Sequence, residues 1–150
     1  SGVVTAMVGL LTALPGTQLF SRLSREGRIV AESTGNNLDA ALNFIPRLDR
    51  ATLIDGYRRL VQQLYAPRTY YRRIRTFLRD FRPAGPRARV YAREVRAFLR
   101  SLWVMGVRAP GRREFWKFIA WTALFHRRAF PHAMYLAITG HHFRKVAAAL

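Results

Sequence analysis

Apolar residues recur at helical spacing along most of the chain after residue 49. In residues 49–65 they stand one, three or four positions apart, which places them on one face of a helix. Asp49 is positioned to cap the first turn, and Pro67 ends the pattern because proline is tolerated only in the first turn of a helix. The inward positions predicted for this helix are Leu53, Ile54, Tyr57, Leu60, Val61, Leu64 and Tyr65.

Residues 67–81 repeat this spacing with aromatic side chains on one side and arginines on the other. Exposed rings between arginines are typical of surfaces that bind single-stranded nucleic acid. Here the helical period predicts that the rings face the core, which argues against nucleic acid as a partner. The inward positions are Tyr70, Tyr71, Ile74, Phe77, Leu78 and Phe81, and the arginines opposite them are Arg72, Arg73, Arg75 and Arg79.

The remaining sequence predicts three further helices. The first runs from about residue 87 to 105, between the linker "RPAGP" and the closing segment "GVRAPG". The next, at about 112–128, is apolar on nearly every face, so we expect it to be buried or to cover a partner. Pro131 begins or kinks the last, which ends near "HHFRKVAAAL". The inward positions predicted for the 87–105 helix are Tyr91, Val95, Phe98, Leu99 and Leu102.

The first thirty residues follow a different pattern. An apolar run in residues 3–11 meets the Pro15–Gly16 turn and passes directly into a helical segment, which predicts one strand–turn–helix unit. Residues 31–48 contain turn-forming residues and fit neither period, so they form a connector. The predicted fold class is mainly α: a bundle of four to five helices in residues 49–150, preceded by the strand–turn–helix of residues 1–30.

Composition and charge narrow the function classes. A chain of 150 residues is about one domain long, and half of its residues are hydrophobic. Charges and histidines interrupt the longest apolar stretch, residues 115–138, so no membrane-spanning helix is predicted. The net charge of +18 lies entirely in residues 47–150. Such asymmetry is typical of proteins that bind an anionic surface. The strong preference for arginine over lysine leaves a second explanation open, in which the charges form a solvent-exposed face that binds nothing.

The sequence lacks the usual parts of an enzyme. It has no cysteine, no phosphate-binding glycine loop and no nucleophile elbow. The adjacent His141 and His142 point to different helix faces, and His126 and His132 stand six residues apart across a proline. Metal ligands on a helix prefer spacings of three or four, so no metal site is predicted.

The order of several short segments is more informative than any single motif. "AMVGLLTALPGTQLFSRLSREGRI", "STGNN" and "LNFIPRLDRATLIDGYRRLVQQLYAPRTYYRRIRTFL" together resemble the C-terminal end of cobalamin-binding-domain radical S-adenosylmethionine proteins. In that family a partial α/β barrel is followed by a helical domain of unknown function. The resemblance implies that residues 1–30 are a remnant of the barrel, its terminal strand–turn–helix, and that residues 49–150 are the appended domain.

The resemblance also implies cofactors and partners. The parent enzyme would use S-adenosylmethionine, a four-iron four-sulfur cluster and cobalamin. The family's CxxxCxxC motif is absent here, so no cofactor is expected in this chain itself. We therefore expect a C-terminal fragment of a longer enzyme, with the upstream barrel and cobalamin domain of the same polypeptide as partners.

By resemblance, the residues closest to the parent's active site follow the strand, because the C-terminal end of a barrel strand carries the chemistry. Thr17 and Gln18 are the polar candidates for contact with cofactor or substrate, although Thr17 could equally cap the following helix. Weaker candidates for a loop facing the substrate are Asn36, Asn37 and Asn43. The full set of cofactor-binding candidates is Ala13, Leu14, Pro15, Gly16, Thr17 and Gln18.

Two roles remain open for the helical domain. It could pack on the barrel and help to enclose substrate, or its basic faces could dock on an anionic membrane surface or, against the burial expected of its aromatic residues, on nucleic acid. The expected location is the cytoplasm, with attachment at the inner face of the membrane under the second alternative.

Overall fold

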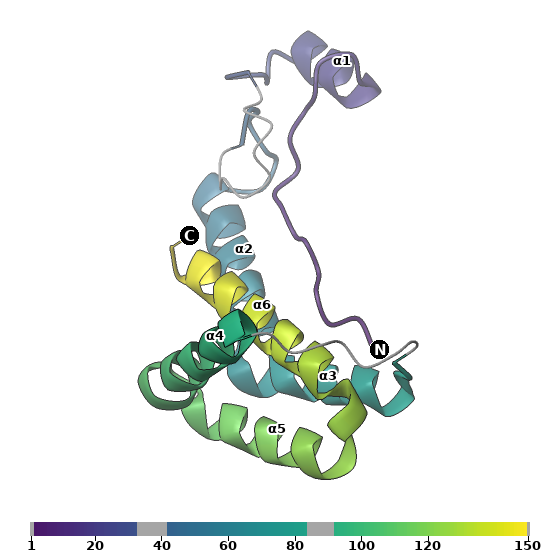
Figure 1. Cartoon of the computed structure of the whole chain (residues 1–150). Coiled ribbons are helices and arrows are strands. Elements are labelled where there is room, and N and C mark those ends of the chain that lie inside the picture. The colour runs from purple at the N-terminus through teal and green to yellow at the C-terminus, as the bar shows by residue number, and fades with distance from the viewer. Residues whose placement is uncertain (1, 33–41, 84–91, 150) are drawn as a thin grey trace. The chain divides into compact units, whose positions relative to one another are not determined.

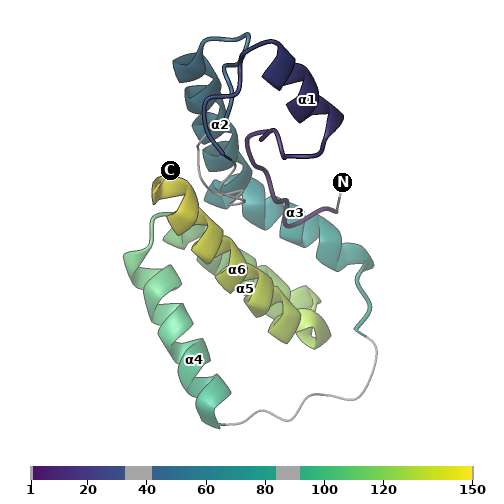
Figure 2. The same cartoon turned by 90° about the horizontal axis from the view of Figure 1, so that it is seen from above.

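Six α-helices make up most of the chain that the computed structural model describes, which is residues 2–32, 42–83 and 92–149 (Figures 1 and 2). A π-helical turn, Val104–Arg108, follows the fourth helix, and a 3₁₀ turn, Arg127–Ala129, precedes the last. The mainly α fold class is confirmed, with five of these helices after Asp49. The helices are α1 Gln18–Arg25, α2 Arg50–Tyr65, α3 Pro67–Asp80, α4 Ala92–Trp103, α5 Arg112–Phe125 and α6 Phe130–Ala149.

The helix boundaries follow the local signals in the sequence. Asp49 caps α2, because its carboxylate accepts hydrogen bonds from the Thr52 backbone N–H and hydroxyl at 2.9 and 3.0 Å. These bonds hold the pKa of Asp49 below its ordinary value. Pro67 is the first residue of α3, as predicted. A backbone N–H at the first position of a helix has no acceptor within the helix, so proline costs no hydrogen bond there. Both predicted boundaries are thus confirmed.

The strand predicted in the first thirty residues is not formed by the described residues 2–30, although the turn and helix after it are present. Residues 2–13 run without helix or strand, and the described ranges hold only an isolated bridge between Ile29 and Phe44 (Figure 1). A strand needs a neighbouring backbone to pair with. Here side chains bind the backbone instead: Tyr65 and Tyr57 donate to the carbonyls of residues 6 and 8 at 2.6 and 3.1 Å.

The chain divides into two compact units. The helical unit comprises residues 1–6 and 63–148, and the turn unit comprises residues 7–62 and 149–150. The domain boundaries predicted after residues 30 and 48 stay predictions. No helix within the described ranges is long and apolar enough to cross a membrane.

The core of the helical unit is built by α3, α5 and α6. On α3, Tyr70, Ile74 and Leu78 are fully buried, which confirms the inward face predicted there. The ring of Tyr71 stacks on Phe118 of α5, with 5.1 Å between the centroids. Arginines of α3 lie against aromatic rings, with Arg73 over Tyr70. The aromatic residues of α3 therefore serve packing within the unit.

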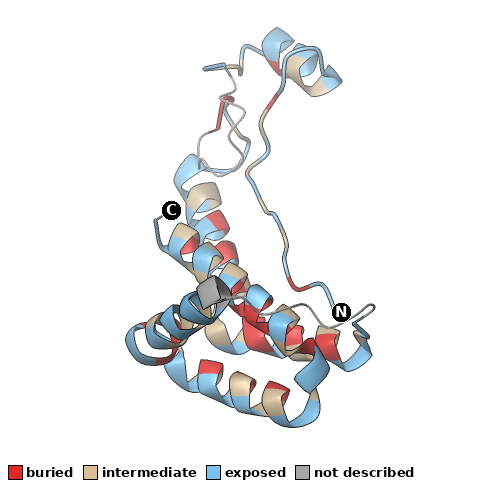
Figure 3. Cartoon of the chain, viewed as in Figure 1, coloured by how far each residue is buried: buried red, intermediate tan, exposed pale blue. Residues whose placement is uncertain are grey.

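Three apolar residues predicted to face inward, Leu60 of α2 and Val95 and Leu99 of α4, are exposed instead. Of the other inward positions predicted for α4, Phe98 and Leu102 are half-buried, and Tyr91 lies outside the described residues. On α5 only one side, with Phe115, Phe118 and Thr122, is buried, although the sequence is apolar all round. Exposed surface on α5 alternates with buried surface along the helix (Figure 3), and its exposed apolar residues are Trp116, Leu124 and Phe125.

The imidazole of His141 gives the helical unit a pH dependence. Neither of its ring nitrogens has a hydrogen-bond partner in the parts of the chain described, although both are buried. Burial, together with the positive charge of Arg144, lowers the pKa of His141 below its ordinary value of 6.5. The unfolded chain therefore takes up this proton at a higher pH than the folded chain does.

The helical unit is accordingly expected to lose stability as the pH falls below about 6.5, since the unfolded state gains the proton first. His141→Leu removes this contribution, and the variant's free energy of unfolding should fall less between pH 7.5 and 5 than that of the parent. The measurement is urea denaturation followed by tryptophan fluorescence. The exposed neighbour His142→Leu is the control, and equal acid sensitivity of His141→Leu and the parent chain would contradict the assignment.

Candidate functional site at the turn before α1

An amide side chain clamps the backbone at the start of the turn. Asn43 donates from Nδ2 to the carbonyl of Ala13 at 2.7 Å and accepts from the Ala13 N–H at its Oδ1 at 2.9 Å. Both residues are buried, so these bonds form away from water. The backbone carbonyl of Asn43 also accepts from the N–H of Val30 at 3.0 Å. One asparagine thus holds together three segments of the turn unit.

The turn itself is closed by Thr17. Its hydroxyl donates to the carbonyl of Leu14 at 2.7 Å and accepts from the backbone N–H of Phe20 at 3.2 Å. The helix-capping role considered for Thr17 is therefore present in the structure. Gly16 has a φ of +80°, a left-handed conformation in which a side chain would be strained. Pro15 and Gly16 form the exposed tip of this turn.

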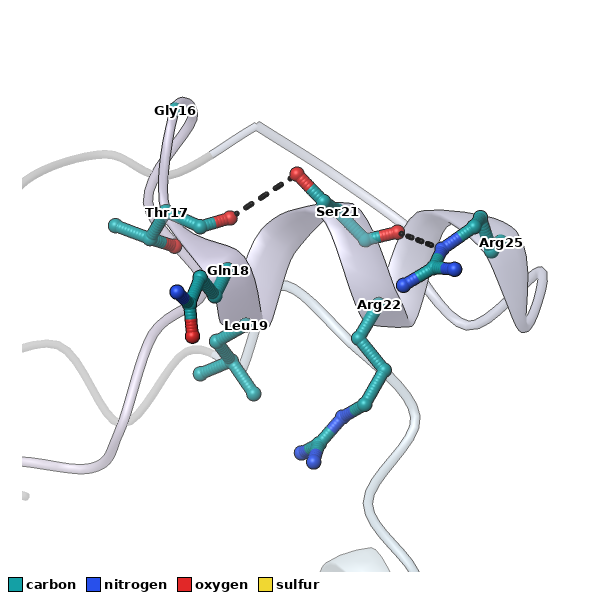
Figure 4. Close-up of a pocket in the computed structure, with 7 residues that line it drawn as sticks. All are labelled: Gly16, Thr17, Gln18, Leu19, Ser21, Arg22 and Arg25. Atoms are coloured by element: carbon teal, nitrogen blue, oxygen red, sulfur yellow. Dashed lines mark hydrogen bonds between the residues drawn. The ribbon is translucent and has the colours of Figure 1, made fainter.

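The turn and α1 line an open hollow of about 520 Å³ (Figure 4). Gln18, Ser21, Arg22 and Arg25 contribute its polar groups, because residues three, four and seven positions apart share one helix face. Arg25 donates from Nε to the carbonyl of Ser21 at 3.4 Å. All four residues are exposed, and the amide of Gln18 makes no hydrogen bond within the described ranges.

The polar groups of this hollow define what it can bind. Two guanidinium groups and an amide suit a ligand that presents a carboxylate, a phosphate or other hydrogen-bond acceptors. Arg22 approaches Glu26 only at 3.9 Å, so its charge stays available. Glu26 instead pairs with Arg28 at 2.8 Å, and this hydrogen bond holds the pKa of Glu26 below its ordinary value. The hollow is therefore a positively charged surface.

A second hollow of about 350 Å³ lies on another side of α1. Arg28 organises its rim, because its guanidinium donates to the carbonyl of Ile45 from Nε at 2.9 Å and from Nη2 at 2.6 Å. The backbone N–H of Ile45 in turn donates to the carbonyl of Arg28 at 2.8 Å. These bonds fix the segment after Asn43 against the end of α1. The lining residues are Leu11, Leu19, Arg22, Leu23, Glu26, Arg28, Phe44 and Arg47.

The structure brings together some of the site residues predicted from the sequence and adds others. Ala13 and Asn43 are in direct contact, and the turn that follows Ala13 leads to Gln18 at the hollow. Asn36 and Asn37 lie outside the described residues. Sequence reasoning missed Ser21, Arg22 and Arg25, although their spacing from Gln18 already places them on its face of α1. No group of three His, Asp or Glu side chains in the described ranges is arranged to hold a metal ion.

The chain is similar to a described protein family and to part of a longer protein. The family described as a domain of unknown function (DUF4070) matches residues 17–150. A protein of Synechocystis sp. named as an uncharacterized methyltransferase is 32% identical over 148 residues. The alignment covers 95% of this chain but 27% of that relative, so the chain spans about a quarter of the relative's length. No solved structure matches the chain.

Proposed function

The chain belongs to the DUF4070 family, and from that premise we propose that it is an accessory part of a methyltransferase-like enzyme. The match to a relative named as a methyltransferase supports this role, because nearly all of this chain aligns with about a quarter of that protein. The proposed class is the cobalamin-dependent radical S-adenosylmethionine enzymes, on the resemblance described above. In this role the chain packs against the barrel and helps to enclose substrate.

The state of residues 2–13 is the observation that carries this proposal. Val3, Met7 and Leu11 are 60, 78 and 64% exposed, and they belong to the odd-numbered positions of the segment, all of which are exposed from residue 3 to residue 11. Among the described residues, no backbone-to-backbone hydrogen bond engages this segment. Side chains bind the carbonyls of residues 6 and 8 and both backbone groups of residue 13, and the remaining backbone groups of this apolar segment are a template for strand pairing. In the intact enzyme this segment would join the sheet of the barrel, which covers these side chains.

The implied cofactors fit this chain unequally. An iron–sulfur cluster needs thiolate ligands, and the chain has no cysteine, so its residues do not fit the cluster. S-adenosylmethionine would supply the methyl group in such enzymes, and the charged hollow beside the turn suits a hydrogen-bond acceptor or an anionic group of the cofactor or of the methyl acceptor. Gln18, Arg22 and Arg25 are the residues of this chain that would hold such a group by charge and hydrogen bonds.

The turn contributes position rather than chemistry in this proposal. Asn43 fixes Ala13, and Thr17 fixes the first turn of α1. Together they hold Gln18 and Arg22 on one rigid face, since both ends of the turn are tied to the backbone. A rigid supporting structure of this kind keeps binding groups in place. Misplaced binding groups lower the rate of an enzyme strongly.

Replacing Gln18 with alanine in the intact gene product is expected to raise the KM for S-adenosylmethionine or the methyl acceptor about tenfold, the value of one lost hydrogen bond to a charged group. The exposed side chain has no partner of its own in the described ranges, so the thermal stability should stay unchanged. The measurement is steady-state methyl transfer from labelled S-adenosylmethionine.

Ser24→Ala is the matched control, because Ser24 is exposed on α1 but does not line the hollow. Unchanged kinetics for Gln18→Ala would contradict the role of the hollow. An intact gene product without a CxxxCxxC motif upstream of residue 1 would contradict the proposed enzyme class.

A further inference from the structure

Helix α4 and the π-helical turn after it carry a row of uncovered apolar side chains, which we name the α4 apolar row. Its members repeat every four residues and are 45 to 59% exposed: Val95, Leu99, Trp103 and Val107. The inward side of the same helix is a separate row. Phe98 packs edge-on against Phe130, with 5.9 Å between the ring centroids, and Met105 is buried. The helix is thus anchored by one face and leaves a second apolar face to the solvent.

The position of α4 in the helical unit keeps this second face open. The helix lies at the edge of the unit, and its outer surface is mostly exposed (Figures 2 and 3). Gly106 of the π-helical turn receives the indole of Trp116 on its inner side, where Trp116 Nε1 donates to the Gly106 carbonyl at 3.0 Å. This contact fixes the end of α4 and directs the α4 apolar row outward.

Positive charge borders the α4 apolar row. Arg96, Arg100 and Arg108 each stand one position after a member of the row, and all three are exposed. None of them takes part in an ion pair with a carboxylate of the described side chains. From residue 92 to residue 113 the sequence has six arginines and one acidic residue, Glu94. The neighbourhood of the row is therefore strongly basic.

We propose that the α4 apolar row and its bordering arginines form a binding surface for anionic phospholipid. A helix with Leu, Val and Trp on one face and arginines beside them lies in the interface of a bilayer, where the apolar side chains enter the acyl boundary. Trp103 suits this depth because indole favours the headgroup region. The arginines then meet lipid phosphates, which they bind strongly.

Charge complementarity supports a lipid surface over a small acidic partner. The basic excess of the chain extends along residues 47–150 of the sequence, well beyond the row and its bordering arginines. A spread of this kind matches an extended, uniformly anionic surface, which attracts the whole chain before the row inserts. The proposal is independent of the proposed enzymatic role, since it concerns where the protein resides and not what it converts.

Sedimentation of the 150-residue chain with lipid vesicles tests the proposal. We expect binding to phosphatidylcholine vesicles that contain phosphatidylglycerol, weaker binding at high salt and none to pure phosphatidylcholine. The Leu99→Ser/Trp103→Ser variant should lose affinity about tenfold or more, because two apolar anchors no longer insert. The Arg96→Gln/Arg100→Gln variant should lose about thirtyfold on anionic vesicles.

Two matched controls separate a site from a general charge effect. Arg68→Gln/Arg72→Gln removes the same charge from exposed positions of α3, and Leu60→Ser removes an exposed leucine from α2. Both controls should bind nearly as well as the parent, and circular dichroism checks that every variant keeps its helices.

Three outcomes would overturn the proposal. One is that the parent chain fails to bind phosphatidylglycerol vesicles at low salt. Another is that the controls lose as much affinity as the α4 variants, which would make binding a matter of net charge alone. The third is that sedimentation velocity shows a dimer that Leu99→Ser/Trp103→Ser dissociates, which would assign the row to a second copy of the chain.

Discussion

Replacing Gly140 with alanine is expected to destabilise the helical unit by about 2 kcal/mol, an overpacking penalty that exceeds the helix propensity gained. A Cβ atom at this position of α6 would lie on the ring of Tyr70, far inside van der Waals contact. Tyr70 is fully buried, and its hydroxyl donates to the carbonyl of Leu136 at 2.8 Å. Burial raises the pKa of Tyr70 to about 12, so this donor stays protonated at all ordinary pH values.

The ring of Tyr70 has little room to withdraw from a new methyl group. Tyr65 and Tyr71 lie beside it, with ring centroids at 5.8 and 6.1 Å, and Arg73 covers one face. Moving the ring would therefore break a buried hydrogen bond and disturb two aromatic contacts. Either the Tyr70 ring or helix α6 must shift, and either shift reduces the packing in the core between α3 and α6.

Denaturation followed by tryptophan fluorescence measures this effect, because all three tryptophans lie in the helical unit, and circular dichroism follows the helix of the control in the turn unit. Gly56→Ala is the matched control: Gly56 is an exposed helical glycine with open space at its Cβ position, so alanine there should stabilise the chain by about 1 kcal/mol. The Gly140→Ala/Tyr70→Leu double variant should be more stable than the sum of the two single changes predicts. Full stability of Gly140→Ala would contradict the close approach of α6 and Tyr70.

The parts of the fold that could be predicted from the sequence are those set by neighbouring residues. Asp49 caps α2 through a bond to Thr52, three positions away, and Pro67 begins α3 through its own ring geometry. The inward face of α3 also follows from the helical spacing of its apolar residues, because the large aromatic side chains all fall on one side of the helix. Local chemistry is sufficient for such features.

Other features depend on residues distant in the sequence. Apolar periodicity on α4 marks a broad stripe, and which part of the stripe is buried depends on where Phe130 lies. The strand expected before the turn needs a partner strand, and none lies beside it in the described ranges. The need for glycine at position 140 comes from Tyr70, seventy residues earlier, so no local signal reveals it. These are consequences of tertiary packing.

The candidate site combines both kinds of feature. Thr17 as a helix cap could be foreseen, because a hydroxyl before α1 is a common capping group. Asn43 is a weaker candidate for a substrate-facing loop, and that role stays a prediction; the structure shows that it is buried and binds Ala13, thirty residues away. A polar residue in a connector gives no indication of a partner so distant. The charged face of α1 could have been predicted from the helical spacing of its residues alone.

Asn43 is also where the second large effect is expected. Asn43→Ala should destabilise the turn unit by about 2–4 kcal/mol, because the N–H and carbonyl of buried Ala13 both lose their partner. Ala13 belongs to an apolar cluster with Leu23, Leu42 and Phe44, so water would have to enter that cluster to satisfy the freed groups. The change should also loosen the turn that leads to Gln18.

Hydrogen exchange of the Ala13 amide, followed by NMR, measures this effect directly, since that proton is the one donated to Asn43. Exchange in Asn43→Ala should be about a hundredfold faster or more, the equivalent of 2.7 kcal/mol or above. Asn43→Asp keeps an acceptor for the Ala13 N–H but turns a carboxylate oxygen toward the Ala13 carbonyl, so it should destabilise the unit as well. Thr17→Ala is the local control, with a cost of about 1 kcal/mol confined to the start of α1. If the Ala13 amide exchanges at the same rate with and without the Asn43 side chain, the clamp does not hold the turn, and the rigid placement of Gln18 and Arg22 loses its basis.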